Sequence, residues 1–259
     1  MRVLITGGSS GLGRAFAENA LARGWRCAVT TRSTSRVRAA FGRDKAVAIV
    51  ESPLRSHDPV ERAFYSAVER IGGVDLLVNN AGAGWFGALE HVSEAELQTL
   101  FHLNVHAPLK LCQLAAAQMR DGGVIVNISS SAGLLGGAGY AAYAASKAAL
   151  SALTEGLQEE LAARRIRVLL VEPGAVATAF LTRSSRFEAP NDPASPASQA
   201  LAAIRAHADR PDRLDPRALA ETVLTAALQP AGPHRLVLGS DAACTAREKI
   251  AALHIGLAD

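Results

Sequence analysis

Short apolar runs alternate with helical segments along this chain, and this alternation restricts its fold more than any other feature. The runs comprise residues 2–6, 26–31, 46–50, 74–78, 124–128, 166–171 and 234–238. Most of these runs are rich in valine, isoleucine and leucine, a pattern that is typical of buried strands. Strands separated by helices in this rhythm form βαβ units, so the sequence predicts a parallel sheet with helices on both faces.

A cluster of glycines follows the first apolar run and opens the first helical segment. The residues are Gly7, Ser9, Ser10, Gly11, Leu12 and Gly13, followed by a helix over residues 14–22. A glycine turn between a strand and a helix places backbone amides where they bind a pyrophosphate group. The spacing is G-x-x-x-G-x-G, which differs from the usual G-x-G-x-x-G fingerprint. In this position the cluster predicts a dinucleotide site.

The end of the second run indicates which dinucleotide is bound. A site for NAD carries an acidic residue there, whereas this chain has Thr31 followed by Arg32. A guanidinium group binds a 2′-phosphate through paired hydrogen bonds, so we expect NADP(H) in preference to NAD(H). Ser10, Ser33 and Arg36 are further candidate contacts. An arginine that merely faces solvent is the alternative interpretation.

Tyr143 and Lys147 are the strongest candidates for catalysis. They are separated by four positions in a helix predicted over about residues 142–164, so both side chains lie on one face. An ammonium group beside a phenol lowers the pKa of the phenol, which favours proton transfer near neutral pH. Ser130 follows the run at residues 124–128, where its hydroxyl can bond a substrate oxygen. A Tyr-x-x-x-Lys spacing alone is common, and an ordinary surface pair is its alternative.

Other polar residues have weaker signals. Asn104 precedes Pro108 in a helix that the proline is expected to kink or break. His102 and His106 have metal-ligand spacing but no third ligand pattern, so we expect no metal. Ser93 and Glu96 have the spacing of a capping box, and Asp215 and Asp241 are predicted helix N-caps.

Composition excludes several classes of protein. The net charge is +3 and the arginines are scattered, so nucleic-acid binding is not expected. Although 49% of residues are hydrophobic, no run approaches the ~20 residues that span a bilayer. The first apolar run is also too short for a signal peptide. Cys27, Cys112 and Cys244 are isolated, and we expect buried thiols in a reducing compartment, which favours a cytoplasmic location.

These motifs, in this order, resemble the short-chain dehydrogenase/reductase family. The matching positions are Thr6 to Gly13, Asn79 to Gly82, Asn104, Ser130, Tyr143, Lys147, Pro173, Gly174 and Thr178. The resemblance implies one Rossmann-type, doubly wound domain over residues 1–259, with about seven parallel strands. Residues 1–120 would form mainly the cofactor half and residues 121–259 the catalytic half. Family members are often homodimers or homotetramers.

The resemblance also assigns roles to residues. Tyr143 would be the general acid or base, Lys147 would adjust its pKa and hold the nicotinamide ribose, and Ser130 would position the substrate oxygen. Asn104 would anchor a water molecule in a proton relay. Cofactor contacts would come from Asn79, Ala81, Gly82, Pro173, Gly174, Val176 and Thr178. The family's aspartate near adenine has no counterpart, which leaves residues 51–54 open as the adenine contact.

The substrate is expected to be a small ketone, aldehyde or secondary alcohol. Residues 179–215 are rich in proline, arginine and serine, and the resemblance makes them the substrate lid. Candidate pocket residues are Trp85, Phe86, Leu134, Leu135, Tyr140 and Phe180, which would favour an apolar substrate. Arg183 and Arg186 could meet an anionic substrate, but solvated charges are the preferred interpretation. The alternatives are an NAD-dependent alcohol dehydrogenase and, less favoured, a non-catalytic sensor of NADP(H).

Overall fold

A seven-stranded parallel sheet organises the molecule, as the alternating pattern predicts. The structure is a computed structural model that describes residues 1–42, 44–54, 57–119, 122–188, 190, 192–206 and 209–255. The strand order is β3-β2-β1-β4-β6-β7-β9, and every pair is parallel. The strands are β1 (Arg2–Ile5), β2 (Arg26–Thr31), β3 (Val47–Glu51), β4 (Leu76–Asn79), β6 (Val124–Ile128), β7 (Arg167–Pro173) and β9 (Arg235–Leu238). This is the doubly wound α/β fold with one continuous sheet.

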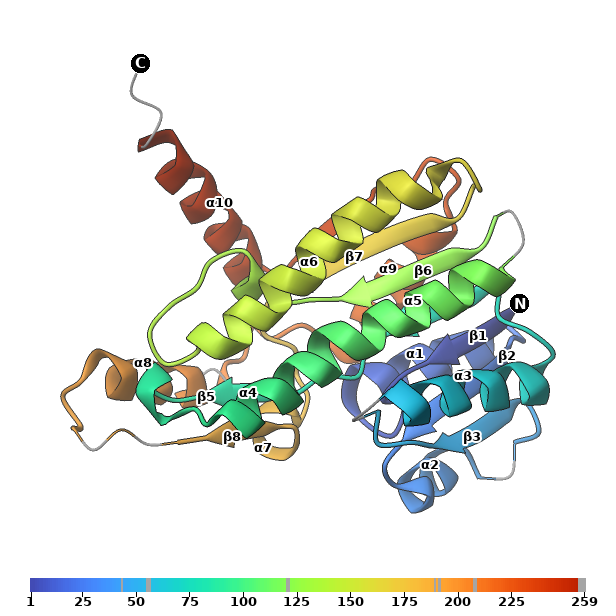
Figure 1. Cartoon of the computed structure of the whole chain (residues 1–259), viewed down its shortest axis with the longest axis horizontal. Coiled ribbons are helices and arrows are strands. Elements are labelled where there is room, and N and C mark those ends of the chain that lie inside the picture. Colours follow the sequence, from blue (N-terminus) through green and yellow to red (C-terminus); the bar gives the residue numbers. More distant parts are fainter. Residues whose placement is uncertain are drawn as a thin grey trace.

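Helices cover both faces of the sheet (Figure 1). One face packs against α1 (Gly11–Ala22) and α9 (Pro216–Leu228), and α2 (Thr34–Phe41) contributes to the same cluster. The other face packs against α3 (His57–Ile71), α5 (Ala107–Gln118) and α6 (Ala141–Ala162). Successive residues of β1 divide between the two cores, because side chains alternate along a strand.

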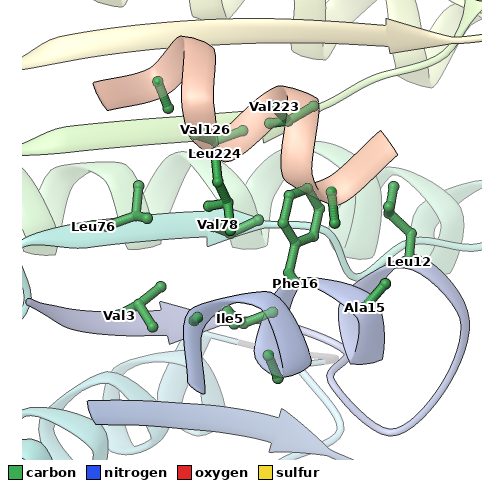
Figure 2. Packing of buried hydrophobic residues seen from close by; sticks show 14 of the residues in the cluster. Val3, Ile5, Leu12, Ala15, Phe16, Leu76, Val78, Val126, Val223 and Leu224 are labelled. Carbon is green, nitrogen blue, oxygen red and sulfur yellow. The ribbon is translucent and has the colours of Figure 1, made fainter. Parts of the chain in front are cut away.

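Phe16 is at the centre of the first core. Its ring is fully buried between the sheet and α9, with Val78 and Leu224 nearby (Figure 2). Full burial of a phenylalanine side chain contributes roughly 1.5–3 kcal/mol to the free energy of unfolding. A large apolar side chain on α1 therefore fixes the glycine turn at the start of this helix against the sheet.

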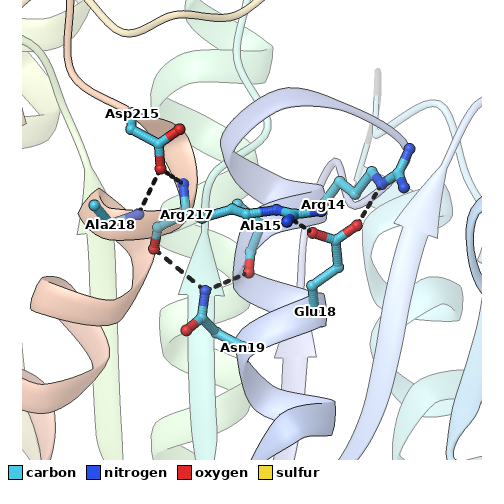
Figure 3. A network of polar contacts seen from close by, with 7 residues as sticks. All are labelled: Arg14, Ala15, Glu18, Asn19, Asp215, Arg217 and Ala218. Atoms are coloured by element: carbon cyan, nitrogen blue, oxygen red, sulfur yellow. Dashed lines mark hydrogen bonds and ion pairs between the residues drawn. The ribbon is translucent and has the colours of Figure 1, made fainter.

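A polar network joins α1 to α9 outside this core (Figure 3). Asp215 caps α9 by accepting hydrogen bonds from the amides of Arg217 and Ala218, both at 2.9 Å, as predicted. Glu18 forms ion pairs with Arg14 at 2.7 Å and with Arg217 at 3.1 Å. Ion pairs at the surface are weak, so the network orients the two helices more than it stabilises them.

The helix that carries Asn104 is continuous through its irregular part. The capping box of Ser93 and Glu96 starts α4 (Glu94–Phe101), as the sequence predicts. A π-helical segment, η2 (His102–His106), follows and leads directly into α5. Pro108 lacks the N–H that would bond the carbonyl of Asn104, and the chain winds wider there instead of breaking.

Residues 179–215 are more regular than their composition suggests. They contain α7 (Phe180–Arg183), β8 (Ser185–Phe187) and α8 (Pro196–Ala206). Strand β8 pairs in parallel with β5 (Gly84–Phe86), which ties this segment to the body of the molecule. Arg186 adds an ion pair with Glu96 at 2.5 Å. Short 3-10 turns lie at η1 (Leu89–His91) and η3 (Ser131–Gly133).

The C-terminal helix, α10 (Ser240–Ile255), projects from the body (Figure 1). Asp241 lies inside its first turn and is not the predicted N-cap, because its carboxylate instead accepts a hydrogen bond from the amide of Ala175 at 2.7 Å. Cys244 on this helix is exposed, which corrects the expectation of a buried thiol, whereas Cys27 and Cys112 are buried. Among the helices described, none is long and apolar enough to cross a membrane.

Gly13 is required by the packing of α1 on the glycine turn. A Cβ added there would overlap the carbonyl oxygen of Gly7 and lie 2.5 Å from the side-chain nitrogen of Asn80. Because two backbone segments cannot separate easily, we expect Gly13→Ala to lower the free energy of unfolding by about 1–3 kcal/mol. Gly156, on α6, has open space around it, so Gly156→Ala should instead stabilise the chain by up to about 1 kcal/mol. Thermal unfolding of the two variants measures both effects, and equal shifts would contradict this account.

Candidate active site

A cleft of about 550 Å³ lies along the carboxyl ends of the sheet strands. This is where open α/β sheets bind their ligands. Most of the residues selected from the sequence line it. They are Gly7, Ser9, Ser10, Gly11, Leu12, Gly13, Thr31, Arg32, Ala81, Gly82, Ser130, Phe86, Tyr140, Tyr143, Lys147, Pro173, Gly174, Val176, Thr178 and Phe180.

The N-terminus of α1 faces the cleft and is suited to an anion. Ser10 is its N-cap residue, yet the Ser10 side chain makes no capping hydrogen bond. The first turn of the helix also contains no acidic residue. Gly7 and Gly11 have positive φ angles of 73° and 54°, which glycine adopts without strain. The turn therefore presents backbone amides that can bind phosphate oxygens.

The end of the cleft at β2 is basic. Thr31 shapes the turn there, because its hydroxyl accepts a hydrogen bond from the amide of Ser33 at 2.9 Å. Arg32 and Arg36 both line this part of the cleft and are exposed. In the described part of the chain, neither arginine forms an ion pair with a carboxylate. Two guanidinium groups are thus available to an anionic ligand.

The residues after β3 complete that end of the cleft. Ser52, Pro53 and Leu54 line it, whereas Glu51 is exposed and is not among the lining residues. Leu54 has an unusual positive φ of 50°, and its amide donates to the hydroxyl of Ser52 at 3.3 Å. Of the four residues that the sequence left open as an adenine contact, these three line the cleft.

Tyr143, Ser130 and Lys147 lie together at the middle of the cleft. The hydroxyl of Ser130 lies near the phenol of Tyr143 and lowers the pKa of this phenol. Burial nevertheless raises the pKa of Tyr143 to about 12, so the prediction that its pKa is lowered is wrong for this arrangement. Burial lowers the pKa of Lys147 to about 8, and its Nζ donates to the carbonyl of Ile128 at 2.9 Å. Burial is the main cause of both pKa shifts, and the charge of Lys147 is not among the causes that act on the pKa of Tyr143.

Asn104 lies behind this group and is fully buried. Its side-chain oxygen accepts from the amide of Ala83 at 2.9 Å, and its nitrogen donates to the carbonyl of Ala83 and the hydroxyl of Ser146. The side chain is therefore occupied by the protein. Pro108 cannot donate a hydrogen bond to the backbone carbonyl of Asn104, because proline has no N–H. The role of Asn104 in holding a water molecule stays a prediction.

Asn79 is placed differently from the prediction. Its side chain points into the core and donates to Asn127 at 2.8 Å, because it shares a strand face with Leu77. The neighbouring Asn80 lines the cleft instead and donates to the backbone oxygen of Thr6 at 2.9 Å. Alternation of side chains along β4 is the signal that could have distinguished these two asparagines.

Three predicted pocket residues are also outside the cleft lining. Trp85 is buried in a separate cluster with Leu100 and Ala142, since it points to the opposite side of β5 from Phe86. Leu134 and Leu135 belong to the loop before α6 and do not line the cleft. Apolar lining near Tyr143 also comes from Leu181 and Ile204, and Leu103 adds apolar lining elsewhere in the cleft; none of the three was predicted as a pocket residue.

Aromatic rings surround Tyr143. Phe86 and Phe180 lie with their ring centroids 5.5 Å and 6.0 Å from that of Tyr143, and Phe187 stacks on Phe86 at 4.9 Å. Leu201 is buried in the same cluster. The phenol thus borders an apolar region that lines the same cleft as the glycine turn.

Comparisons with known proteins agree with this geometry. The short chain dehydrogenase family matches residues 1–189. A 3-oxoacyl-[acyl-carrier-protein] reductase from Homo sapiens is 34% identical over 178 residues, which are 67% of this chain and 75% of the relative. The chain therefore belongs to the short-chain dehydrogenase family, a family of oxidoreductases.

Two solved structures of this family extend the comparison. A short chain dehydrogenase/reductase from Burkholderia phymatum, in complex with NAD, is 25% identical with a TM-score of 0.84, covering 98% of this chain and 94% of its own. A short chain dehydrogenase from Burkholderia cenocepacia, in complex with NADP, is 30% identical with a TM-score of 0.73, covering 90% and 91%. Related proteins thus bind either form of the nicotinamide cofactor.

Proposed function

We propose that this protein is an NADP(H)-dependent oxidoreductase that interconverts a small ketone or aldehyde and the corresponding alcohol. The observation that carries the proposal is that Tyr143, Ser130 and the buried Lys147 line the same cleft as the glycine turn, with the Ser130 hydroxyl close enough to the phenol to lower its pKa. A non-catalytic sensor of NADP(H) would not require these three groups together, so this alternative is less favoured.

The residues of the cleft fit a nicotinamide dinucleotide. The amides at the start of α1 suit the pyrophosphate, and Pro173, Gly174, Val176 and Thr178 would hold the nicotinamide side. The choice of NADP(H) depends on Arg32 and Arg36, whose charges suit a 2′-phosphate. One similar structure is in complex with NAD, so an NAD-dependent alcohol dehydrogenase is the alternative within the same fold.

When bound, NADP(H) supplies or accepts the hydride. In reduction, the phenol of Tyr143 donates a proton to the substrate oxygen, and the hydroxyl of Ser130 donates a hydrogen bond to the same oxygen. A phenol whose pKa is about 12 is fully protonated at neutral pH, which is the form that reduction requires. With a pKa of about 8, Lys147 is mainly an ammonium at pH 7 and stabilises the phenolate that remains.

The substrate side of the cleft favours an apolar molecule. Phe86, Phe180, Leu181 and Ile204 border it near Tyr143. Arg183 and Arg213 also line the cleft, but Arg183 is exposed to solvent. A homodimer or homotetramer in the cytoplasm remains our prediction, and size-exclusion chromatography with light scattering would measure the assembly.

Titration with NADPH and NADH, followed by fluorescence, tests the cofactor proposal. We expect tighter binding of NADPH and a loss of about 10- to 100-fold in Arg32→Ala, because a charge-assisted hydrogen bond contributes roughly 1.5–3 kcal/mol. NADH affinity should stay within about threefold, since NADH lacks the 2′-phosphate. Arg38→Ala is the matched control, because Arg38 lies on α2 outside the cleft lining. Equal affinities of the wild type for both cofactors would reject the role of Arg32.

A further inference from the structure

A buried carboxyl group lies behind the cleft at the end of β7. Glu172 has no exposed surface. Its Oε1 atom is 2.9 Å from the hydroxyl of Ser151 on α6. The reaction proposed above assigns no role to this group, although burial of a carboxyl group is costly unless it is neutral or fully paired.

Ser151 connects Glu172 to the helix that carries the catalytic residues. The hydroxyl of Ser151 is 2.9 Å from that of Ser129, and the Ser129 hydroxyl is 3.0 Å from the backbone carbonyl oxygen of Lys147. Both serines are buried. Three consecutive contacts of hydrogen-bond length therefore run from the carboxyl group to Lys147.

The number of hydrogens available to these contacts decides the state of Glu172. Each hydroxyl carries one hydrogen, and the carbonyl of Lys147 carries none. Three hydrogen bonds need three hydrogens, so the two serines leave one contact without a donor if Glu172 is ionised. A protonated Glu172 supplies the third: it donates to Ser151, Ser151 donates to Ser129, and Ser129 donates to Lys147.

The charges around Glu172 do not require the ionised form. Arg235 on β9 is the nearest cation, with its Nε 3.1 Å from Oε2, but Oε2 has no hydrogen-bond partner of acceptable geometry. The same guanidinium is shared with Glu155 on α6, at 2.7 Å. Burial is the largest cause and raises the pKa of Glu172; the contact with Ser151 and the charge of Arg235 lower this pKa, and the charge of Glu155 raises it.

We propose that Glu172 is a neutral carboxylic acid at pH 7 and a positioning residue for Lys147. Its proton completes the chain of hydrogen bonds, which fixes the turn of α6 that carries Lys147 against the strand end that carries Ser130. Gly133 leaves room for the contact, because a Cβ there would lie 3.0 Å from the backbone of Lys147. The positioning role rests on the function proposed above, whereas the protonation state does not.

Difference infrared spectroscopy tests the protonation state without any turnover. Comparing the wild type with Glu172→Gln at pH 7, we expect a carboxylic-acid carbonyl band in the wild type that is missing in the variant. A carboxylate band in its place would overturn the proposal. Failure to bind NADPH or to reduce any carbonyl compound would reject the proposed function. The infrared measurement would still decide the protonation state of Glu172, because it does not depend on cofactor binding or turnover.

Enzyme kinetics test the positioning role. The amide of Glu172→Gln can donate to Ser151 as the acid does, so kcat should stay within about threefold of the wild type. In Glu172→Ala the chain loses its first donor, and we expect kcat to fall about tenfold with little change in KM for NADPH. In the pH profile of kcat, the transition near pH 8 that reports the ionisation of Lys147 should shift in Glu172→Ala but not in Glu172→Gln. Equal impairment of both variants would contradict the proposal.

Thermal unfolding gives a third readout that does not depend on the alanine variant. A carboxyl group with a raised pKa holds a proton that the unfolded chain releases near pH 4.5, so the wild type loses stability as the pH rises. Gln has no such proton. The difference in Tm between Glu172→Gln and the wild type should therefore grow in favour of the variant from pH 5 to pH 8, and a constant difference would count against a neutral Glu172.

Discussion

Replacement of Tyr143 by phenylalanine is expected to reduce kcat/KM for carbonyl reduction by about 10²- to 10⁴-fold, the usual contribution of a general acid. The variant keeps the aromatic ring near Phe86 and Phe180 and loses only the hydroxyl that lies near Ser130. NADPH affinity should therefore change by less than about threefold. Stopped-flow turnover and fluorescence titration measure the two quantities separately.

Tyr65→Phe is the matched control, because Tyr65 is exposed on α3 and does not line the cleft. Loss of NADPH binding together with activity in Tyr143→Phe would mean that the phenol is structural. In the wild type, the oxidation rate should also increase with pH, since oxidation uses the phenolate and the pKa of Tyr143 is about 12. Reduction should not depend on this group between pH 6 and 9.

Replacement of Lys147 by methionine should reduce kcat by at least about 100-fold. Methionine fills a similar volume but carries no charge and donates no hydrogen bond to Ile128. The ammonium that stabilises the phenolate is therefore lost while the packing of α6 is retained. Lys249→Met is the control, because Lys249 is exposed on α10. Retention of more than a tenth of the wild-type kcat would exclude a catalytic role for Lys147.

The same variant reports the lowered pKa of Lys147 through its effect on stability. Between about pH 8 and 10.5 the unfolded wild type still holds the lysine proton while the folded wild type has released it. The free energy of unfolding of the wild type therefore rises with pH in this window. The difference in Tm, taken as Lys147→Met minus wild type, should be largest near pH 7 and decrease towards pH 10. A difference that does not change with pH would show that the pKa is not lowered.

Local patterns in the sequence were sufficient for the sheet and for most of the cleft. Each apolar run became a strand of the expected sheet, because a buried parallel strand needs apolar side chains on both faces. The glycine turn, Arg32 and the four-residue spacing of Tyr143 and Lys147 are short-range features, so their approximate positions follow from the chain itself. The caps formed by Ser93 and Asp215 are local for the same reason.

The errors arose where the environment depends on residues far apart in the sequence. The pKa of Tyr143 reflects burial by Phe86 and by the lid segment, which no local spacing reveals. Asp241 bonds Ala175, which lies 66 positions away, so its cap-like position was misleading. Trp85 and Phe86 point in opposite directions because β5 pairs with β8, and that pairing joins two segments about 100 residues apart.

The order of the strands has a consequence for how the chain acquires its structure during synthesis. The first three strands place β1 at one edge of the sheet. The later strands β4, β6, β7 and β9 then follow one another outward from β1, in the order in which they occur in the sequence. An emerging chain can therefore extend the sheet one neighbour at a time, starting from the part that contains the glycine turn. At each of these stages, the growing edge is covered by the next strand to leave the ribosome, whereas β3 stays at the opposite edge of the sheet throughout.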